Sequence, residues 1–209
     1  SKEDSEMGST PQGNSSFAGI DFEIINRSAN PVVVGGQTYA VGNVVMTITT
    51  DESGHASTGS DLLPYGTYEV REAATNESML LTWQGETVQV RQNGHSVSVT
   101  AVNDVERGGL AVEKQDTITG STPQGDANFE GITFEIINNS RNPVMVEGQK
   151  YQPGEVVKTL VTDAEGKAST ADDLLPYGEY ILHESATNES MLLTAPDQTV
   201  NVTDDGVMY

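Results

Sequence analysis

The sequence contains no cysteine and few basic residues, and each shortage excludes a class of protein. Without cysteine there can be no disulfide bonds, no thiolate metal sites and no cysteine nucleophile. Only 10 lysines and arginines accompany 31 aspartates and glutamates, which gives a formal net charge of −21. Such a charge repels nucleic acids and anionic membranes and keeps a long molecule soluble. We therefore expect neither a nucleic-acid partner nor a phosphate-binding role.

Long hydrophobic runs are missing as well. No apolar stretch approaches the roughly 18 residues that a membrane helix needs, and no signal peptide or sorting tail can be recognised. We expect no membrane insertion in this fragment, which we interpret as an excerpt of a longer protein.

An internal repeat dominates what is present. The motif FEII at Phe22 returns at Phe134, and ATNESMLLT at Ala74 returns unchanged at Ala186, each time 112 residues later. The match has no insertion, so the chain holds two copies of one module. We predict domains at residues 1–105 and 106–209, joined by a short polar linker. We expect the first strand of the first domain to be clipped at the N-terminus and the last strand of the second domain to be missing at the C-terminus.

Strand signals fill each copy. Stretches rich in β-branched residues alternate with glycine-, asparagine- and proline-containing turns, as in residues 43–50, 87–91 and 95–102 of the first copy, and long helical periodicity is absent. The pattern predicts an all-β protein made of two tandem antiparallel β-sandwiches, each with roughly seven to nine strands as in immunoglobulin-like domains. The segment AATNES at residues 73–78 is compatible with a turn or a short helical piece.

A glutamate ends one predicted strand of each copy on the apolar face. Side chains alternate across a strand, so Tyr68, Val70 and Glu72 share one face. In the second copy Tyr180 and Glu184 do the same. Each sandwich core therefore receives a carboxylate.

An asparagine and a lysine of other strands are also predicted to point into the core. The last predicted strand of the first copy places Asn103 on the same face as Val99 and Ala101. The first strand of the second copy places Lys114 with Leu110, and the repeat offset makes Lys2 its equivalent. A buried lysine, glutamate or asparagine is costly alone, because a hydrophobic core cannot replace its hydration.

Together, the three groups have a chemical use. Burial lowers the pKa of a lysine and raises the pKa of a glutamate, so the amine becomes a neutral nucleophile and the carboxyl holds a proton. Beside an asparagine amide, with the acid polarising the carbonyl and relaying protons, such an amine can form a new amide bond and release ammonia. The product would cross-link the first and last strands.

These residues resemble a known family. The pattern KxD at Lys2 and Lys114, LPxGxYxxxE ending at Glu72 and Glu184, and a closing Asn103 is similar to the collagen-adhesin B-type, or SpaA-like pilin, repeat domains of Gram-positive surface proteins. The resemblance covers nearly all of both copies. It implies a prealbumin-like sandwich stiffened by a self-formed isopeptide bond, with Lys2 as nucleophile, Asn103 as acceptor and Glu72 as proton shuttle.

The second copy departs from this pattern. Adding the 112-residue offset to Asn103 gives position 215, which lies beyond Tyr209. Lys114 and Glu184 consequently have no evident acceptor in this chain. Asn201 is a poor substitute, because its neighbours Val200 and Val202 take the inward phase. We expect a bond in the first copy and none within the second.

Simpler interpretations stand beside this one. The glutamates can be strand-end residues turned to solvent, the lysines can extend to the surface, and Asn103 can cap a strand. Asp104 is chemically able to act as acceptor, but strand alternation points its side chain outward.

The other candidate residues carry no repeated site. His55, His95 and His183 belong to no repeated position, so we interpret them as surface residues. We predict no metal site and no cofactor, although the acidic DESG and DAEG turns leave calcium as an alternative. Trp83 is interpreted as partial core filling or as an exposed contact residue.

The predicted function is structural. Near-identical modules suit the stalk of a bacterial adhesin or pilin, which holds a distal part away from the cell wall, and a single self-made bond does not make the protein an enzyme. The predicted location is the surface of a Gram-positive bacterium, and the partners are neighbouring repeats. A host matrix protein or glycan would be bound by other parts of the parent protein. The alternatives are an adhesin domain that binds such a ligand directly and an accessory domain of a secreted enzyme.

Overall fold

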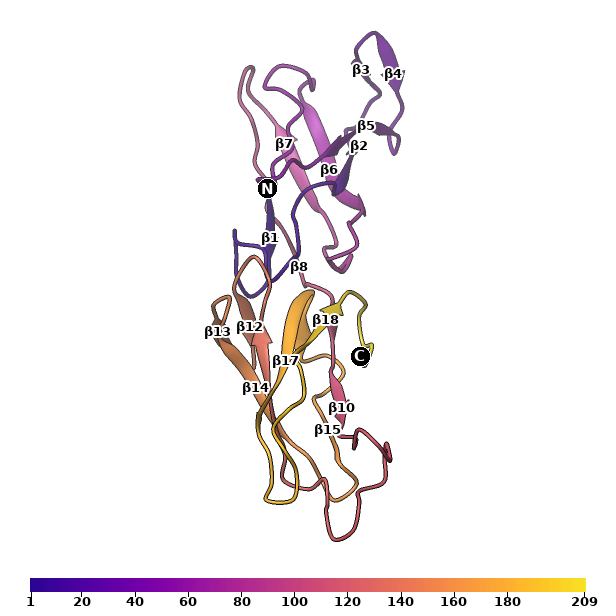
Figure 1. Cartoon of the computed structure of the whole chain (residues 1–209). Coiled ribbons are helices and arrows are strands. Elements are labelled where there is room, and N and C mark those ends of the chain that lie inside the picture. The colour runs from indigo at the N-terminus through magenta and orange to yellow at the C-terminus, as the bar shows by residue number, and fades with distance from the viewer. The chain divides into compact units, whose positions relative to one another are not determined.

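The structure, a computed structural model, describes residues 1–209 and contains strands and no helix (Figure 1). The chain divides into two compact units, one formed by Ser1–Pro11 with Ser16–Asp104 and the other by Gln12–Ser15 with Val105–Tyr209. The prediction of two tandem all-β sandwich domains is confirmed. No helix is long and apolar enough to cross a membrane.

The first unit is built around a four-stranded antiparallel sheet in the order β5-β2-β6-β7. Its longest strand, β6, carries the glutamate that ends the LPYG motif. The strands of this unit are β1 (Lys2–Asp4), β2 (Asp21–Asn26), β3 (Val32–Val34), β4 (Gln37–Tyr39), β5 (Val44–Thr49), β6 (Gly66–Ala74), β7 (Glu86–Val90) and β8 (Ala101–Asn103).

The second unit repeats this sheet in the order β14-β11-β17-β18. Two short pairs, β10 with β15 and β9 with β16, supply further strands. The strands of this unit are β9 (Arg107–Gly108), β10 (Ala111–Glu113), β11 (Thr133–Asn138), β12 (Val144–Val146), β13 (Gln149–Tyr151), β14 (Val156–Val161), β15 (Lys167–Ser169), β16 (Leu175–Pro176), β17 (Gly178–Ala186) and β18 (Gln198–Val202).

One pair in the first unit is parallel. β1 and β8, the first and last strands, run side by side in the same direction, with Lys2 opposite Ala101 and Asp4 opposite Asn103. Parallel neighbours need a long crossover, and here the whole sheet of the first unit forms it. The two ends of this unit are thereby brought next to each other.

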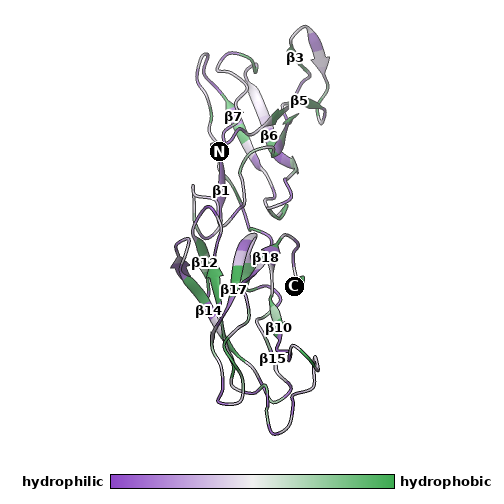
Figure 2. Cartoon of the chain, in the orientation of Figure 1, coloured by the Kyte–Doolittle hydropathy of each residue, from purple (hydrophilic) through white to green (hydrophobic).

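The alternation of apolar and polar residues along the strands determines which side chains form the core. In β11 the burial pattern alternates strictly, with Phe134, Ile136 and Asn138 inside, because successive side chains of a strand point to opposite faces. Figure 2 shows the hydrophobic residues of β12 and β14, of which Val144, Val146 and Val157 are buried in the second core. The matching core of the first unit contains fewer fully buried side chains.

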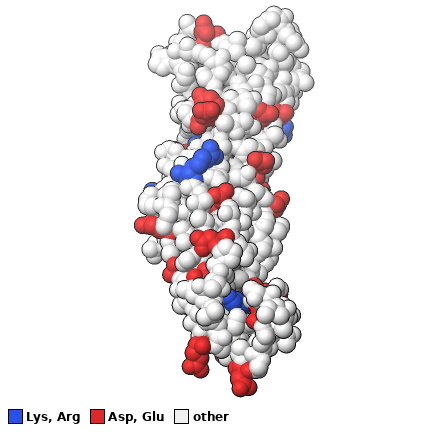
Figure 3. Space-filling view, in the orientation of Figure 1, with Lys and Arg blue, Asp and Glu red and all other residues white.

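Most charged residues lie outside these cores, and the buried exceptions are Lys2, Asp4, Glu72, Lys114 and Glu184. Acidic side chains are scattered over the face seen in Figure 3, where basic ones are few. This distribution agrees with the net charge of −21 and leaves no basic patch on the visible face for an anionic partner.

The LPYG motif has a structural role in both units. The hydroxyl of Tyr68 donates to the Pro64 carbonyl at 2.9 Å, and that of Tyr180 donates to the Pro176 carbonyl at 2.7 Å. Gly66 is required by close packing, because an added Cβ would lie 2.5 Å from the hydroxyl oxygen of Ser28. The motif thus fixes the start of the strand that carries the inward glutamate.

The AATNES segment begins with the last two residues of β6, Ala73 and Ala74, and continues into a turn at Glu77 and Ser78. Asn76 holds it by donating from its side-chain nitrogen to the carbonyls of Ser16 and Ala18, at 2.8 and 2.9 Å. Asn188 makes the equivalent contacts in the second unit. Of the two conformations that the sequence left open, the structure adopts the turn.

The buried tyrosine contact predicts a graded loss of stability. We expect Tyr180→Phe to lower the free energy of unfolding by about 1–3 kcal/mol, because it leaves the buried Pro176 carbonyl without a donor. Tyr68→Phe is the matched control with a smaller loss, since Pro64 is only half-buried. Urea denaturation of the full chain measures both, and an equal loss for the two variants would contradict this account.

Candidate functional site

Three strands of the first unit bring one amine, one carboxyl and one amide together. Lys2 comes from β1, Glu72 from β6 and Asn103 from β8, and the three residues are 2%, 4% and 1% exposed. All three therefore point into the core, as the alternation in the sequence requires. The interpretations that place them at the surface do not describe this structure.

Glu72 bridges the other two side chains. Its Oε1 accepts a hydrogen bond of 2.7 Å from Asn103 Nδ2. Its Oε2 lies 3.5 Å from Lys2 Nζ, and neither of these two atoms has a hydrogen-bond partner. One carboxyl group thus contacts both the amine and the amide nitrogen.

The amide carbonyl has a separate donor. The backbone N–H of Trp83 donates to Asn103 Oδ1 at 3.1 Å. The Trp83 ring stands edge-on to Phe22, with centroids 5.8 Å apart, so Trp83 is half-buried and fills part of the core. From the sequence we expect the glutamate to polarise this carbonyl. The contact with Trp83 could not be predicted, because the donor is a backbone N–H and the side-chain pattern of a sequence carries no information about such donors.

Burial shifts both ionisable groups toward their neutral forms. Loss of hydration lowers the pKa of the Lys2 amine, against the opposing attraction of Glu72. Loss of hydration also raises the pKa of the Glu72 carboxyl, against the opposing effects of Lys2 and Asn103. Both pKa shifts are therefore in the direction of the neutral form of each group.

The nearby aspartates have other tasks. Asp4, the last residue of the KxD pattern, is buried and accepts hydrogen bonds from the backbone N–H groups of Glu6 and Met7, both at 2.8 Å. It shapes the turn after β1. Asp104 is exposed, and its carboxylate accepts a hydrogen bond from the Ser5 hydroxyl, in agreement with its outward phase.

The second unit contains the amine and the carboxyl without the amide. Lys114 Nζ donates to Glu184 Oε2 at 2.6 Å, and the side chains are 8% and 0% exposed. The other oxygen of Glu184 is buried and has no hydrogen-bond partner. Asn201 is exposed on β18, where it pairs with Glu179, so the structure does not bring it to this pair.

The remaining sequence candidates lie elsewhere. Asp51 of the DESG turn accepts hydrogen bonds from the backbone N–H groups of Ser53 and His55, so its carboxylate is used by its own turn. His55 and His95 are exposed, and His183 contacts Asp197 at the surface. No group of three or more histidines and carboxylates is placed to hold a metal ion.

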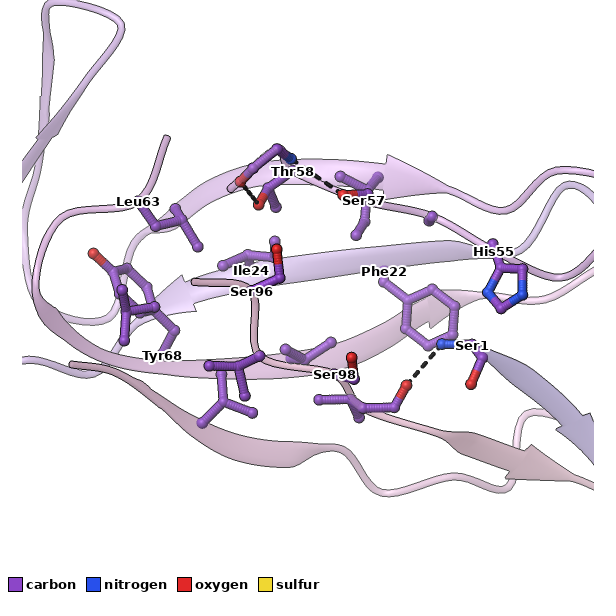
Figure 4. A pocket seen from close by; sticks show the side chains of 18 of the residues that line it. Ser1, Phe22, Ile24, His55, Ser57, Thr58, Leu63, Tyr68, Ser96 and Ser98 are labelled. Carbon is purple, nitrogen blue, oxygen red and sulfur yellow. Dashed lines mark hydrogen bonds between the residues drawn. The ribbon is translucent and has the colours of Figure 1, made fainter. Parts of the chain in front are cut away.

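A cavity of about 460 Å³ lies inside the first unit (Figure 4). Its wall includes Phe22, Ile24 and Tyr68 from the inner face of the sheet. At matching places in the second copy, Ser96 and Val97 are replaced by the larger Met208 and Tyr209. The inner face of the sheet forms one side of the cavity, and the other side is formed by residues 55–60 and 95–99, which lie outside the strands and are mostly exposed.

Comparison with known families and structures gives a consistent result. The family described as SpaA, prealbumin-like fold domain, matches residues 9–105 and again residues 110–209. No curated protein matches the sequence significantly.

Several solved structures are similar to this chain. The Bacillus anthracis TIE protein is 20% identical with a TM-score of 0.59, over 99% of this chain and 31% of its own. A streptococcal ancillary pilin is 19% identical with a TM-score of 0.38, over 100% and 59%. The minor pilin GBS52 of Streptococcus agalactiae is 18% identical with a TM-score of 0.36, over 94% and 81%. The chain thus spans about a third of the first protein and three fifths of the second.

Proposed function

Because the chain belongs to the family of SpaA prealbumin-like fold domains, we propose that its units are structural modules of a surface protein and that an isopeptide bond closes the first one. The family resemblance found in the sequence is confirmed. The bond joins Lys2 to Asn103 and is made by the domain itself. The observation that supports it is the Glu72 carboxyl, which contacts both the amine and the amide nitrogen in a buried site.

The proposed step balances without any further reactant. The neutral amine of Lys2 attacks Cγ of Asn103, so that an Nζ–Cγ bond forms and the Cγ–Nδ2 bond breaks. The Glu72 carboxyl gives its proton to the leaving nitrogen and takes one from the attacking amine, so it ends the step protonated as it began. The N–H of Trp83 stabilises the negative charge that develops on the carbonyl oxygen. The products are one amide and one ammonia.

Such a bond changes the energetics of the first unit. It closes a loop of about 100 residues, and the loss of chain entropy in the unfolded state is worth about 4–5 kcal/mol. That is comparable with the whole stability of a small domain. It also removes the desolvation free energy of a buried amine and a buried amide whose shared contact is a single carboxyl group.

The position of the bond suits a stalk. Force applied along the chain enters near Lys2 and leaves near Asn103, which β1 and β8 hold side by side. A covalent bond between these two strands would transmit the force directly from one to the other, so that the sheet formed by the residues between them bears no load. We place these modules, with proposed limits at residues 1–105 and 106–209, in the stalk of an adhesin or pilin on a Gram-positive cell surface, next to similar modules. Bond formation happens once in each molecule, so it is maturation and not enzymatic turnover.

Direct ligand binding is the weaker candidate. The most exposed large apolar side chains, Tyr65, Ile118 and Leu192, come from different segments. Tyr65 is in contact with Arg91, whose guanidinium lies 4.7 Å from its ring centre. No specific observation favours a ligand over the structural role.

Intact-mass spectrometry tests the bond. We expect the folded chain to be lighter than its sequence by one ammonia, and we expect Lys2→Ala and Glu72→Ala to restore the full mass because they remove the nucleophile and the proton carrier. Proteolysis should yield a branched peptide that joins the segments around residues 2 and 103.

Glu184→Gln is the matched control. It removes the equivalent carboxyl of the second unit and should leave the ammonia loss unchanged, because no amide lies at that site. A full mass in a properly folded wild-type sample would contradict the proposal.

Pulling on single molecules tests the mechanical role. With handles at both chain ends, we expect the first unit to resist extension and the second to release its full length. Glu72→Ala should add a second unfolding event of about 340 Å, the extended length of roughly 100 residues. Full-length unfolding of both units in the wild-type chain would show that no bond spans the first.

A further inference from the structure

The second unit includes four residues that are far from the rest of it in the sequence. The segment Gln12–Ser15 forms one compact unit with Val105–Tyr209. Gln12 is 0% exposed there, and Gly13 and Ser15 are buried as well. The second unit therefore has a surface that receives a short, separate segment of chain.

Backbone atoms make most of the contacts to this segment. Gly13 N donates to the Pro143 carbonyl at 3.0 Å, and the Gly13 carbonyl accepts from the Asn142 N–H at 3.0 Å. Asn14 N donates to the Tyr177 carbonyl at 3.1 Å. Recognition of the segment thus depends on its backbone conformation, because donors and acceptors of the main chain must align on both sides.

Two positions of the segment also require a particular residue. Gln12 Oε1 accepts a hydrogen bond of 2.8 Å from the Met145 N–H, and the buried glutamine side chain reaches this donor from within the unit. Gly13 has a φ of 55°, and an added Cβ would lie 2.2 Å from the Tyr177 carbonyl oxygen. The receiving surface is therefore selective for glutamine followed by glycine.

The internal repeat contains this segment a second time, and there it is exposed. The motif STPQG that ends at Gly13 returns with its end at Gly125, where Gln124 and Gly125 are exposed. The turn has the same conformation, since Gly125 has a φ of 57° and Ala127 N donates to the Gln124 carbonyl at 3.0 Å, against 2.8 Å for the corresponding bond of the first copy. The segment Gln124–Ala127 is thus already shaped for the same kind of surface.

The receiving surface is repeated too, and in the first unit it is open. Its four members in the second unit are Asn142, Pro143, Met145 and Tyr177. The 112-residue offset gives their counterparts in the first unit as Asn30, Pro31, Val33 and Tyr65. All four counterparts are exposed, and the exposed fractions of Val33 and Tyr65 are 57% and 72%.

The same hydrogen bonds hold this surface in both units. Asn26 Nδ2 donates to the Asn30 carbonyl at 3.1 Å, and the equivalent bond of the second unit is 3.2 Å. The Ser28 hydroxyl donates to the Thr67 carbonyl at 3.1 Å, and its equivalent is 3.0 Å. The open surface of the first unit therefore has the shape of the occupied one.

We propose that Asn30, Pro31, Val33 and Tyr65 form a docking site for the segment Gln124–Ala127 of a second copy of this chain. The proposal rests on the proposed role as a module next to similar modules, and it does not require the isopeptide bond. The two surfaces differ, so the contact is heterologous and can continue from copy to copy in a head-to-tail order. One short segment buries little area, so the contact is weak alone and is strengthened where modules are held close together.

A peptide with the sequence of Ser121–Asn128, titrated into the isotope-labelled full chain, tests the docking site. We expect NMR shifts centred on the backbone amides of Asn30 and Val33 and none at the occupied surface of the second unit. Peptides with Gln124→Ala or Gly125→Val should give no shifts, because the first lacks the acceptor and the second carries a side chain where only glycine fits. These controls leave the folding of the protein untouched.

A gain of affinity provides a second test. In the second unit the Arg141 guanidinium donates to the Asn14 carbonyl at 2.9 Å, whereas the counterpart of Arg141 in the first unit is Ala29. We expect Ala29→Arg to tighten peptide binding several-fold, because it supplies this charged donor. Ala29→Lys is the matched control, which adds the same charge without the planar guanidinium and should tighten binding less.

Sedimentation of the full chain tests whether a second copy is the occupant. We expect the average mass to rise with concentration and the rise to be lost in Gln124→Ala. A chain that stays monomeric at concentrations where the peptide binds would overturn the second copy as occupant. Folded protein that gives no shifts with several millimolar peptide, or equal shifts with the Gln124→Ala peptide, would overturn the docking site.

These outcomes are independent of the proposed bond. Loss of one ammonia without peptide binding leaves the bond in place and removes the docking site. Peptide binding to a chain of full mass leaves the docking site in place and removes the bond.

Discussion

The burial of one carboxyl between an amine and an amide is the constraint on which the first unit depends. Three strands must converge for Glu72 to contact both Lys2 and Asn103, and the parallel pairing of β1 with β8 supplies that convergence. These three buried polar groups lower the stability of the fold, because they make few hydrogen bonds. A buried polar atom without a partner loses its contacts with water and gains nothing in their place. The proposed conversion of the amine and the amide into one neutral amide would remove most of that cost.

The same geometry connects chemistry with mechanics. A pulling force enters and leaves this unit through its first and last strands, so the proposed covalent bond between them would protect the hydrogen bonds of the sheet. Loss of hydration lowers the pKa of the Lys2 amine and raises that of the Glu72 carboxyl, and the backbone N–H of Trp83 donates to the carbonyl oxygen of Asn103. In the second unit Lys114 donates to one carboxyl oxygen of Glu184, and the other oxygen has no hydrogen-bond partner.

Much of this arrangement could be predicted from the sequence because strand alternation is a local rule. It placed Glu72, Glu184, Lys2, Lys114 and Asn103 in the core, where the structure has them. Contacts between distant segments could not be predicted. The donor to Asn103 is a backbone N–H, and the fully buried Asn26 holds its loop through the carbonyls of Asn30 and Tyr39. Val97, which alternation assigns to the core, is 50% exposed because regular pairing begins only at Ala101.

The electron density between Lys2 and Asn103 in a high-resolution crystal structure is the most direct measure of the central claim. The account predicts continuous density from Lys2 Nζ to Asn103 Cγ at about 1.33 Å, the length of an amide bond, with Glu72 beside it. Two separate side chains in a well-folded first unit, with the amide nitrogen of Asn103 still in place, would contradict it.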